Sequence, residues 1–523
     1  MTTPGSYVFK WTISNAPCTA TEDEVTVTTS VCAYYSRATG NVTDPIWSDT
    51  PTGTAGPATF TSSTSMVVQD PDVVTNTTNT QVDDLTIEAG APNGQLVLTT
   101  GTIFTVNGDA MVVNGTLTAN DNSIMLLSPA VASTASFAST TSFWDLAVDA
   151  AVSCTVTGNI EIRGSLDLFD GIFDCSANQV TLRSTATYTG RLGPVDPGAS
   201  YVGNMRVQRR IPAGATNWRL LGSPIAGRIV DDWDDDFITA GYPGSDFPGF
   251  QSPVGSGISW PSIRYYDETE ASAIDSVGMH GVANTTVSLA QGQGFAVWCG
   301  DALGGTAAFI IDVQNGAPHI ANSPITLPMS YTNTGNALAD GWNLVSNPLP
   351  SPIDFETMSL GAGVDSVVYF YNPANGNSAT YDRYSNLGDN GGTNVIQSSQ
   401  GFFLKASGSA VTTTVSESDK INTNGGGIFG IGGQVPAHLR LSIASDVNTF
   451  SDETVVYFTA GTPELDERDA LKCGFAHSAA PQLATLASGA QIAHQCLRQY
   501  RRCHQYPPAR ERGCHRHLRH QWR

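Results

Sequence analysis

The sequence has little charge, and positive charge is especially scarce. Only 14% of its 523 residues are charged, and lysine occurs only at Lys10, Lys405, Lys420 and Lys472. The formal net charge is −22 at pH 7, and the isoelectric point is near 4.6. A chain of this sign repels phosphate backbones and anionic lipid headgroups. Nucleic acids and lipid surfaces are therefore not expected as partners.

Long apolar runs are also lacking. No stretch approaches the roughly 18 apolar residues of a membrane span. The opening Met1-Thr2-Thr3-Pro4-Gly5 lacks the basic and apolar regions of a signal peptide. As written, the sequence is expected to have neither an export signal nor a membrane anchor.

Nine cysteines occur without the spacing of a disulfide framework. Cys18 and Cys32 could close a local disulfide, and the sequence alone does not decide this. Cys154 and Cys175 alternate with apolar residues, which predicts small core residues.

Catalytic motifs are missing as well. The sequence has no Gly-x-Ser-x-Gly elbow, His-Glu-x-x-His pair or Walker loop, and its lone Gly-x-Gly at 292–294 does not open a strand–helix unit. The histidines before the tail are scattered, which leaves little for general-base chemistry. We therefore expect a non-enzymatic protein without a cofactor, calcium being the alternative considered below.

The sequence is rich in Thr, Ser, Gly, Asn and Val, which favour strands and turns. Alternating residues over 5–30 predict an antiparallel hairpin, and two strands alone do not form a stable domain in water. We interpret 1–36 as the C-terminal hairpin of an immunoglobulin-like or PKD-like domain. The polar stretch 37–79 is predicted to be a linker.

Short strands separated by Asn-Gly, Asp-Gly and Gly-Thr turns fill residues 80–196. Such strands cannot each bury a face alone, so stacking as a β-solenoid resembling a parallel β-helix is favoured. An ordinary sandwich is the competing interpretation.

Residues 197–420 contain the same three landmarks twice. Trp218 and Trp342 each begin a Trp-x-Leu strand that ends in Pro, an aromatic strand follows, and then a Gln-Gly-Phe string at 293–295 and 400–402. Landmarks repeated in the same order predict a duplicated β-sandwich-like module. A Gly-rich linker (421–437) and the start of a further β domain (438–493) follow.

The tail 494–523 has a different composition, with eight arginines and five histidines. One interpretation is a basic arm or metal site; its candidate ligands are Cys496, Cys503, His504, Cys514, His515 and His517, whose spacing fits no standard zinc pattern. The other is a shifted reading frame, because the same nucleotides, read one base later, can encode an alternating β-like peptide. We favour the shifted frame.

The Trp342 string continuing to Asp354, the Trp218 motif and the 451–456 segment together resemble large secreted surface proteins of Bacteroidetes. That family carries a C-terminal sorting domain of the type IX secretion system. The resemblance covers about 200–492 and implies an extracellular or cell-surface location. It also implies that this chain is a fragment, because it shows no signal peptide and no sorting domain.

Three groups of residues are candidate sites. The acidic run at 231–236 could supply oxygen ligands to Ca²⁺, through Asp232, Asp234, Asp235 and Asp236, although adjacent aspartates also form solvated turns. Acidic residues on the predicted solenoid could pair for polysaccharide cleavage or simply face solvent; they are Asp145, Asp149, Glu161, Asp167, Asp170 and Asp174. Aromatic residues could form a sugar-binding platform or pack in the core; they are Trp218, Tyr265, Tyr266, Trp298, Trp342, Tyr369 and Tyr371.

The sequence therefore predicts an all-β, multi-domain structural or adhesive scaffold of the cell surface, with glycans or surface proteins as candidate partners. The alternative is a carbohydrate-binding or polysaccharide-degrading protein that uses the solenoid. Carboxylates converging in one groove would favour the alternative, and carboxylates on separate faces would favour the scaffold.

Overall fold

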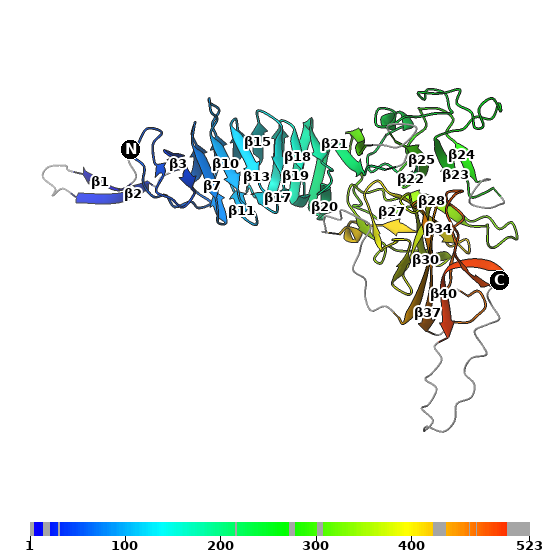
Figure 1. Ribbon diagram of the computed structural model, residues 1–523. Coiled ribbons are helices and arrows are strands. Elements are labelled where there is room, and N and C mark those ends of the chain that lie inside the picture. Colours follow the sequence, from blue (N-terminus) through cyan, green and yellow to red (C-terminus); the bar gives the residue numbers. More distant parts are fainter. Residues whose placement is uncertain are drawn as a thin grey trace, which may run out of the picture.

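The protein is almost entirely β-structure, as predicted. The computed structural model describes residues 5–13, 21–29, 32–214, 217–270, 278–300, 307–421, 436–459, 461–466 and 468–498. About 50% of the chain lies in strands and 2% in helix. The helical turns are the short 3-10 segments η1 (Val230–Trp233) and η2 (Glu417–Asp419). Figure 1 shows an elongated stack of strands that joins a wider head built from several sheets.

The elongated part is a β-solenoid of about six turns, which confirms the predicted stacking. Its strands pair in parallel on three faces. The first face contains β3 (Ala33–Ser36), β6 (Ser65–Val68), β9 (Leu85–Ile87), β12 (Ala110–Val113), β15 (Ser133–Phe137) and parts of β17 (Asp145–Thr157), β19 (Ser165–Leu182) and β21 (Ala199–Ile211). The second contains β4 (Gly40–Asn41), β7 (Val73–Asn76), β10 (Gln95–Leu98), β13 (Thr116–Ala119), β16 (Thr141–Phe143), β18 (Ile160–Ile162) and further parts of β19 and β21. The third contains β8 (Thr80–Val82), β11 (Ile103–Val106), β14 (Ile124–Leu127), β20 (Arg191–Val195) and the first parts of β17 and β19.

The solenoid core consists of alternate residues stacked from turn to turn. Leu96 and Leu98 of β10 are fully buried, and they pair in register with Val74 and Asn76 of β7. Strand geometry sends neighbouring side chains to opposite faces, so every second residue enters the core. The predicted core cysteines Cys154 and Cys175 are 1% and 0% exposed, as expected.

The first turn is closed by an aromatic cap that the sequence interpretation assigned to a linker. Trp47 in β5 (Trp47–Ser48) is 1% exposed, and its ring contacts Phe60 edge-on at 4.8 Å. Phe60 also contacts Tyr34 at 5.6 Å. The predicted linker 37–79 is therefore wrong, because its strands form the beginning of the solenoid. Outward positions such as Ser65 and Thr75 are polar, which contributed to the linker-like composition of the stretch.

The N-terminal residues form the predicted hairpin. Strands β1 (Gly5–Ile13) and β2 (Thr21–Thr29) pair in antiparallel register, with Phe9 opposite Val25. The predicted boundary at residue 36 lies too late, because β3 already belongs to the solenoid. The predicted turn at 15–17 and the cysteine Cys18 of the proposed disulfide lie outside the described residues.

The two modules have the same sheet order. In module 1, β22 (Asn217–Leu221), β25 (Phe295–Cys299), β23 (Ile263–Tyr266) and β24 (Met279–Gly281) form one antiparallel sheet. In module 2, β28 (Trp342–Ser346), β34 (Gly401–Ala406), β30 (Val364–Asn372), β31 (Asn377–Asp382) and β32 (Leu387–Asp389) follow the same order. The smaller pairs β27 (Ile325–Thr326) with β35 (Thr414–Val415), and β29 (Ile353–Asp354) with β33 (Val395–Ile396), complete module 2. Module 1 therefore begins after β21 rather than at the predicted residue 197, since β21 still pairs with β19 of the solenoid.

Register also agrees between the modules. Leu221 pairs with Phe295 in module 1, and Val345 pairs with Phe402 in module 2. The contacts between modules are reciprocal, because Leu221 bridges to Gln400 while Val345 bridges to Gln293. Reciprocal contact of equivalent surfaces is the signature of a two-fold relation. The two modules are thus related by a local two-fold axis within one chain.

The repeated Gln-Gly-Phe string is explained by this packing. A Cβ on Gly294 would lie 2.5 Å from the carbonyl oxygen of Val345, and a Cβ on Gly401 would lie 2.9 Å from the backbone of Leu220 and Leu221. Each glycine therefore allows its strand to approach the Trp strand of the other module.

The solenoid ends against both modules. Strand β21 pairs in antiparallel fashion with β26 (Phe309–Gly316), which closes one exposed edge of the last turn. Strand β20 is held by module 2. The N–H of Leu192 donates to the Pro350 carbonyl at 2.9 Å, and the N–H of Val195 donates to Glu417 Oε2 at 2.9 Å.

A mixed sheet follows the Gly-rich stretch, whose residues 422–435 lie outside the described residues. It contains β36 (His438–Ala444), β37 (Ser451–Thr459), β38 (Ala470–Leu471), β39 (Thr485–Ala487) and β40 (Ala490–Arg498). The boundary predicted after residue 493 falls inside β40. His494 and Cys496 are both fully buried there, because a histidine and a thiol fit the inward positions of a strand that pairs with β37.

Candidate functional site

The acidic residues of the solenoid lie on separate faces. Asp145 and Asp167 lie on the third face, Asp174 on the first and Glu161 on the second. Asp149 and Asp170 are in register on adjacent turns, and both are exposed. The predicted residues therefore do not all converge in one groove.

Most of these carboxylates accept hydrogen bonds within the protein, namely Asp145, Glu161, Asp167, Asp170 and Asp174. Glu161 accepts a hydrogen bond from the Arg183 guanidinium at 2.9 Å. Asp145 Oδ1 accepts the Ser165 N–H at 2.6 Å, and burial raises the Asp145 pKa to about 6. These contacts give the carboxylates of Asp145 and Glu161 a structural role.

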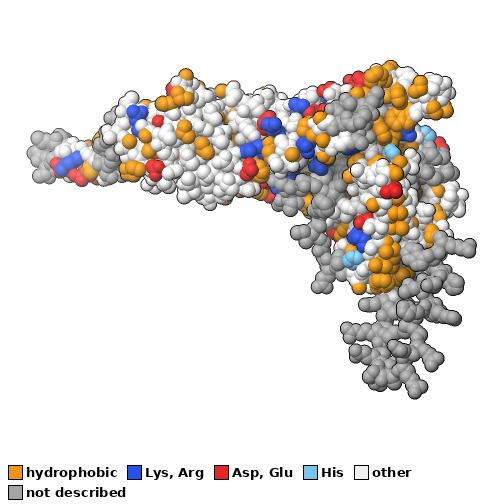
Figure 2. Space-filling model, viewed as in Figure 1, with side chains coloured by type: hydrophobic (Ala, Val, Ile, Leu, Met, Phe, Trp, Pro, Cys, Tyr) orange, Lys and Arg blue, Asp and Glu red, His pale blue; other side chains and the backbone are white. Residues whose placement is uncertain are grey.

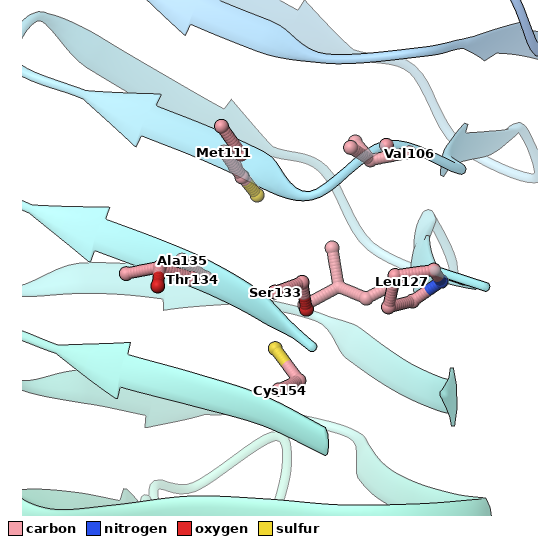
Figure 3. Close-up of a pocket in the computed structure, with 10 residues that line it drawn as sticks. Val106, Met111, Leu127, Ser133, Thr134, Ala135 and Cys154 are labelled. Carbon is pink, nitrogen blue, oxygen red and sulfur yellow. The ribbon is translucent and has the colours of Figure 1, made fainter. Parts of the chain in front are cut away.

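A cavity in the solenoid wall is too small for a sugar. It has a volume of about 10 Å³ and is lined by side chains and backbone of successive turns, among them Met111, Leu127 and Cys154 (Figure 3). A cavity of this size holds about one water molecule.

The acidic run lies at the edge of the head, where it lines a solvent-open hollow. The residues along its wall are Asp231, Asp232, Asp234, Asp235 and Gln314. Asp236, the fourth predicted calcium ligand, points elsewhere: its Oδ2 accepts the N–H of Asp312 at 2.7 Å.

Most of the predicted calcium ligands are engaged by the protein itself. Asp232 accepts the Ile229 N–H at 2.8 Å and lies 3.4 Å from the Arg228 guanidinium. Asp234 accepts a short hydrogen bond from the Thr239 hydroxyl. Within the described part of the chain, no three ligand groups of this run lie within 4.8 Å of one another. Burial raises the Asp236 pKa to about 8.

A different trio does bring ligand atoms together. Asp267, Glu270 and His280 place a carboxylate oxygen or ring nitrogen each within 4.8 Å of the others. The His280 Nε2 lies 3.7 Å from Glu270, while Asp267 accepts the Thr269 N–H and hydroxyl, which lowers the Asp267 pKa. The trio is partly exposed at the end of β23, and the sequence interpretation did not single it out.

The predicted aromatic platform is divided between the two modules. Trp342, Tyr369 and Tyr371 are buried in module 2. Trp218 and Trp298 are half-buried in module 1, and their rings meet edge-to-face at 5.4 Å. Tyr265 and Tyr266 are also half-buried. The rings do not form one flat surface.

Sequence reasoning missed three members of the module 1 aromatic cluster. Trp260 contacts Trp218 and Trp298, each at 5.6 Å, and Phe250 contacts Trp260 at 5.8 Å. The Arg264 guanidinium lies over the rings of Trp218 and Trp260, 4.9 and 5.4 Å from their centres. Phe250 and Trp260 lie outside the repeated landmarks, so the repeat gave no signal for them. Arg264 begins the aromatic strand of the first repeat, but only its aromatic neighbours were considered for a platform.

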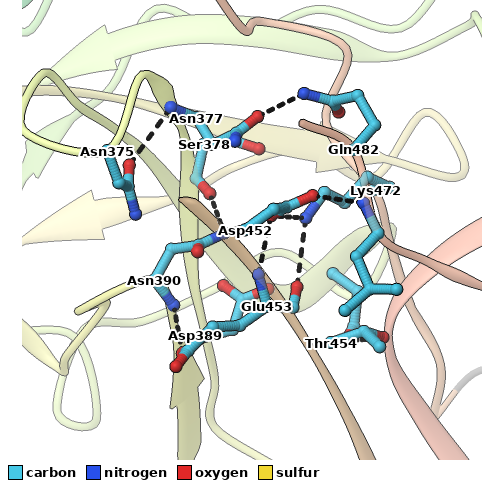
Figure 4. A network of polar contacts seen from close by, with 12 residues as sticks. Asn375, Asn377, Ser378, Asp389, Asn390, Asp452, Glu453, Thr454, Lys472 and Gln482 are labelled. Atoms are coloured by element: carbon cyan, nitrogen blue, oxygen red, sulfur yellow. Dashed lines mark hydrogen bonds and ion pairs between the residues drawn. The ribbon is translucent and has the colours of Figure 1, made fainter. Parts of the chain in front are cut away.

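A buried polar network connects module 2 to the C-terminal sheet (Figure 4). Lys472 forms an ion pair with Asp452, whose side chains are 3% and 0% exposed. Asn390 donates to Asp452 Oδ1 at 2.8 Å, and the Leu483 N–H donates to Asp452 Oδ2 at 2.6 Å. Every contact of this Asp452 is inside the protein, so the network is structural.

His494 lies at the end of the same region. Its Nε2 is 3.0 Å from the Thr380 hydroxyl, which donates to Asp389 at 2.8 Å. Burial lowers the His494 pKa to about 4 and raises the Asp389 pKa to about 6. All three residues are fully buried, so no substrate reaches them.

Of the candidate metal ligands in the tail, only Cys496 belongs to the described residues. Cys496 is fully buried, and its thiol contacts the Thr459 hydroxyl at 3.0 Å. The other candidate ligands lie outside the described residues.

Comparison with known proteins adds no relative, because no family model, curated protein or solved structure matches the chain. Among the described residues, no helix has the length and apolar character needed to cross a bilayer.

Proposed function

We propose that this protein is a non-enzymatic scaffold of the cell surface or extracellular space, in which the solenoid serves as a stiff stalk for the head. The observation that carries the proposal is the joint between stalk and head. A stiff stalk can present its head at a defined angle only if the joint between them is fixed, and this joint is closed by buried polar contacts.

The joint contains a fully buried lysine. Lys420 has a side-chain exposure of 0% and forms an ion pair with Glu417 at 2.7 Å. It also donates to the Gly193 carbonyl of β20 at 2.9 Å, while Glu417 Oε1 accepts the Ala321 N–H at 2.7 Å. Burial lowers the Lys420 pKa, and Glu417 opposes this shift. Such a pair fixes geometry, because either partner alone would be a buried unpaired charge.

The distribution of carboxylates supports a scaffold over the polysaccharide-cleaving alternative. Hydrolysis of a glycosidic bond needs two carboxyl groups about 5–10 Å apart on either side of the sugar bond. The solenoid distributes its predicted acids over three faces, and the two that share the third face, Asp145 and Asp167, already accept hydrogen bonds within the protein. Of the pair in register on adjacent turns, Asp149 and Asp170, the Asp170 carboxylate accepts the Gly171 N–H.

A surface location, and membership of the Bacteroidetes type IX secretion proteins, belong to the same proposal. Their support is the acidic, lysine-poor composition and the Trp-x-Leu and Ser451–Val456 motifs. Antibody labelling of intact and of permeabilised cells tests the location. Labelling only after permeabilisation would contradict it.

Electron microscopy of single particles tests the stalk. We expect the wild-type chain to show one narrow distribution of angles between solenoid and head, and the Lys420→Met variant to show a broad one. The control is Lys10→Met, because Lys10 lies in the hairpin at the opposite end of the stalk. A broad distribution in the wild type would refute the rigid-stalk role.

A further inference from the structure

One sheet face of module 2 is completely covered. Trp342, Tyr369 and Phe403 on this face are each 1% exposed. Part of the cover is the extended segment 470–475, whose Ala470 and Cys473 are buried in the same cluster. Tyr266 of module 1 also contacts Phe403, with ring centres 5.5 Å apart. The Phe475 ring lies 5.1 Å from Tyr371 and 6.2 Å from Phe403.

The described residues cover the equivalent face of module 1 only in part: Leu220 and Ala296 are buried in the same cluster, and the outer positions of the face are not. By register, Trp218 corresponds to Trp342, Arg264 to Tyr369 and Trp298 to Lys405. The three module 1 residues are only half-buried. The covering segment reaches this face at its border, where Phe475 contacts Trp218 at 6.4 Å. The half-buried outer part of this face is therefore continuous with an interface that an extended segment already occupies.

A loop beside this face enlarges the apolar surface. Residues 247–260 form it, and the Phe250–Trp260 contact joins it to the tryptophans. Phe247 is 53% exposed, Phe250 37%, Val254 91% and Ile258 64%. Figure 2 shows hydrophobic side chains gathered at this outer end of the head. Monomeric soluble proteins rarely expose a large contiguous apolar patch, and such patches mark interaction surfaces.

The chemistry of the patch favours a polypeptide over a sugar. A sugar ring stacks on an open aromatic face, whereas Arg264 already lies over the rings of Trp218 and Trp260. Tryptophan and arginine are enriched at the centres of protein interfaces, where other charged residues are depleted.

We propose that the module 1 face, defined by Trp218, Phe250, Val254, Trp260 and Trp298, docks an extended, uncharged segment of another protein through an aromatic anchor. The local two-fold relation supplies the geometry, since segment 470–475 occupies the equivalent face of module 2 in this manner. The inference goes beyond the stalk role, because a stalk can be stiff whether or not its head has a partner.

The test uses a random peptide library displayed on phage and selected on the full-length chain. We expect the selected peptides to share an aromatic residue in an uncharged context. Their affinity should fall at least about tenfold for the Phe250→Ser/Val254→Ser variant, since loss of an interface anchor costs more than about 1.4 kcal/mol. Both residues are exposed, so the variant should keep the wild-type melting temperature.

The matched control is Val447→Ser, which removes an equally apolar side chain, 84% exposed, from the C-terminal sheet region. Peptide affinity should be unchanged in this variant. Selected peptides that bind the Phe250→Ser/Val254→Ser variant as tightly as the wild type, or no selected peptides at all, would overturn the proposal. A glycan array with signals that the same variant abolishes would also overturn it, and would assign the face to carbohydrate.

Discussion

Asp236 couples the acidic loop to the end of the solenoid. Its carboxylate accepts the N–H of Asp312, and Asp312 in turn pairs with Arg206 of β21. Burial raises the Asp236 pKa from 3.8 to about 8 in the folded protein. A raised pKa means that the folded state binds the proton more tightly than the unfolded state.

The pH dependence follows from that sign. The stabilising contribution of protonated Asp236 is complete below pH 3.8 and is lost as the pH rises through about 8. In the wild type, the free energy of unfolding should therefore decline between pH 4 and 8 as Asp236 loses its proton. We expect this part of the decline to be absent in the Asp236→Asn variant. Denaturant titrations at several pH values measure it, with exposed Asp235→Asn as control. Equal slopes for wild type and Asp236→Asn would contradict the assignment.

Lys472 and Asp452 give a second prediction for single residues. Replacing Lys472 with Met leaves the Asp452 carboxylate buried without its cation, so we expect a loss of about 3–5 kcal/mol in unfolding free energy. Lys10→Met is the matched control, because Lys10 pairs with Glu22 in an exposed hairpin where ion pairs contribute about 0–1 kcal/mol. Similar losses in both variants would show that the buried pair has no special role.

Among the elements, the short solenoid strands depend on stacking. Leu96 is fully buried between Val74 and Leu117 of adjacent turns. We expect Leu96→Ala to cost about 2–5 kcal/mol, because the stacked neighbours cannot close the space. Val97→Ala on the outward side of the same strand should cost much less, and thermal unfolding of both variants measures the difference. Equal costs would mean that the strand is not packed as described.

The elements differ in how far the sequence could predict them. Turn dipeptides and alternation identified the strands from residue 80 onward. The first turn was missed because its apolar inward residues, such as Met66, Val68 and Val74, are few and lie among many Ser and Thr residues, which have the composition of a linker. The covering role of segment 470–475 was also unpredictable, because it depends on a partner face formed by distant parts of the chain.

At the scale of the whole molecule, the duplicated modules were predictable because their landmarks serve the contact between them. The Trp strands and the Gln-Gly-Phe strings lie at the two-fold axis. The aromatic patch of module 1 was not predictable, since Phe250 and Trp260 belong to a loop without a counterpart among those landmarks.

Gly222 and Ser346 are equivalent residues that meet at this axis. A Cβ on Gly222 would lie 2.0 Å from Ser346 Oγ and 2.2 Å from Ser346 Cβ. We therefore expect Gly222→Ser to destabilise the chain by about 1–3 kcal/mol through overpacking. The exchanged variant Gly222→Ser/Ser346→Gly should recover most of the loss, which a double-mutant cycle of unfolding measures. An additive cycle would contradict the contact.

The Gly222–Ser346 contact also bears on how such a pair of modules can change over time. In a symmetric dimer of separate chains, every residue on the axis faces its own copy, so a single substitution alters both sides of the contact at once. Joining the two copies in one chain removes that coupling, and here one copy carries the hydroxyl group while the other leaves room for it. The same independence lets the outer faces diverge, so that the chain's own segment buries one face and leaves the described outer part of the other half-buried.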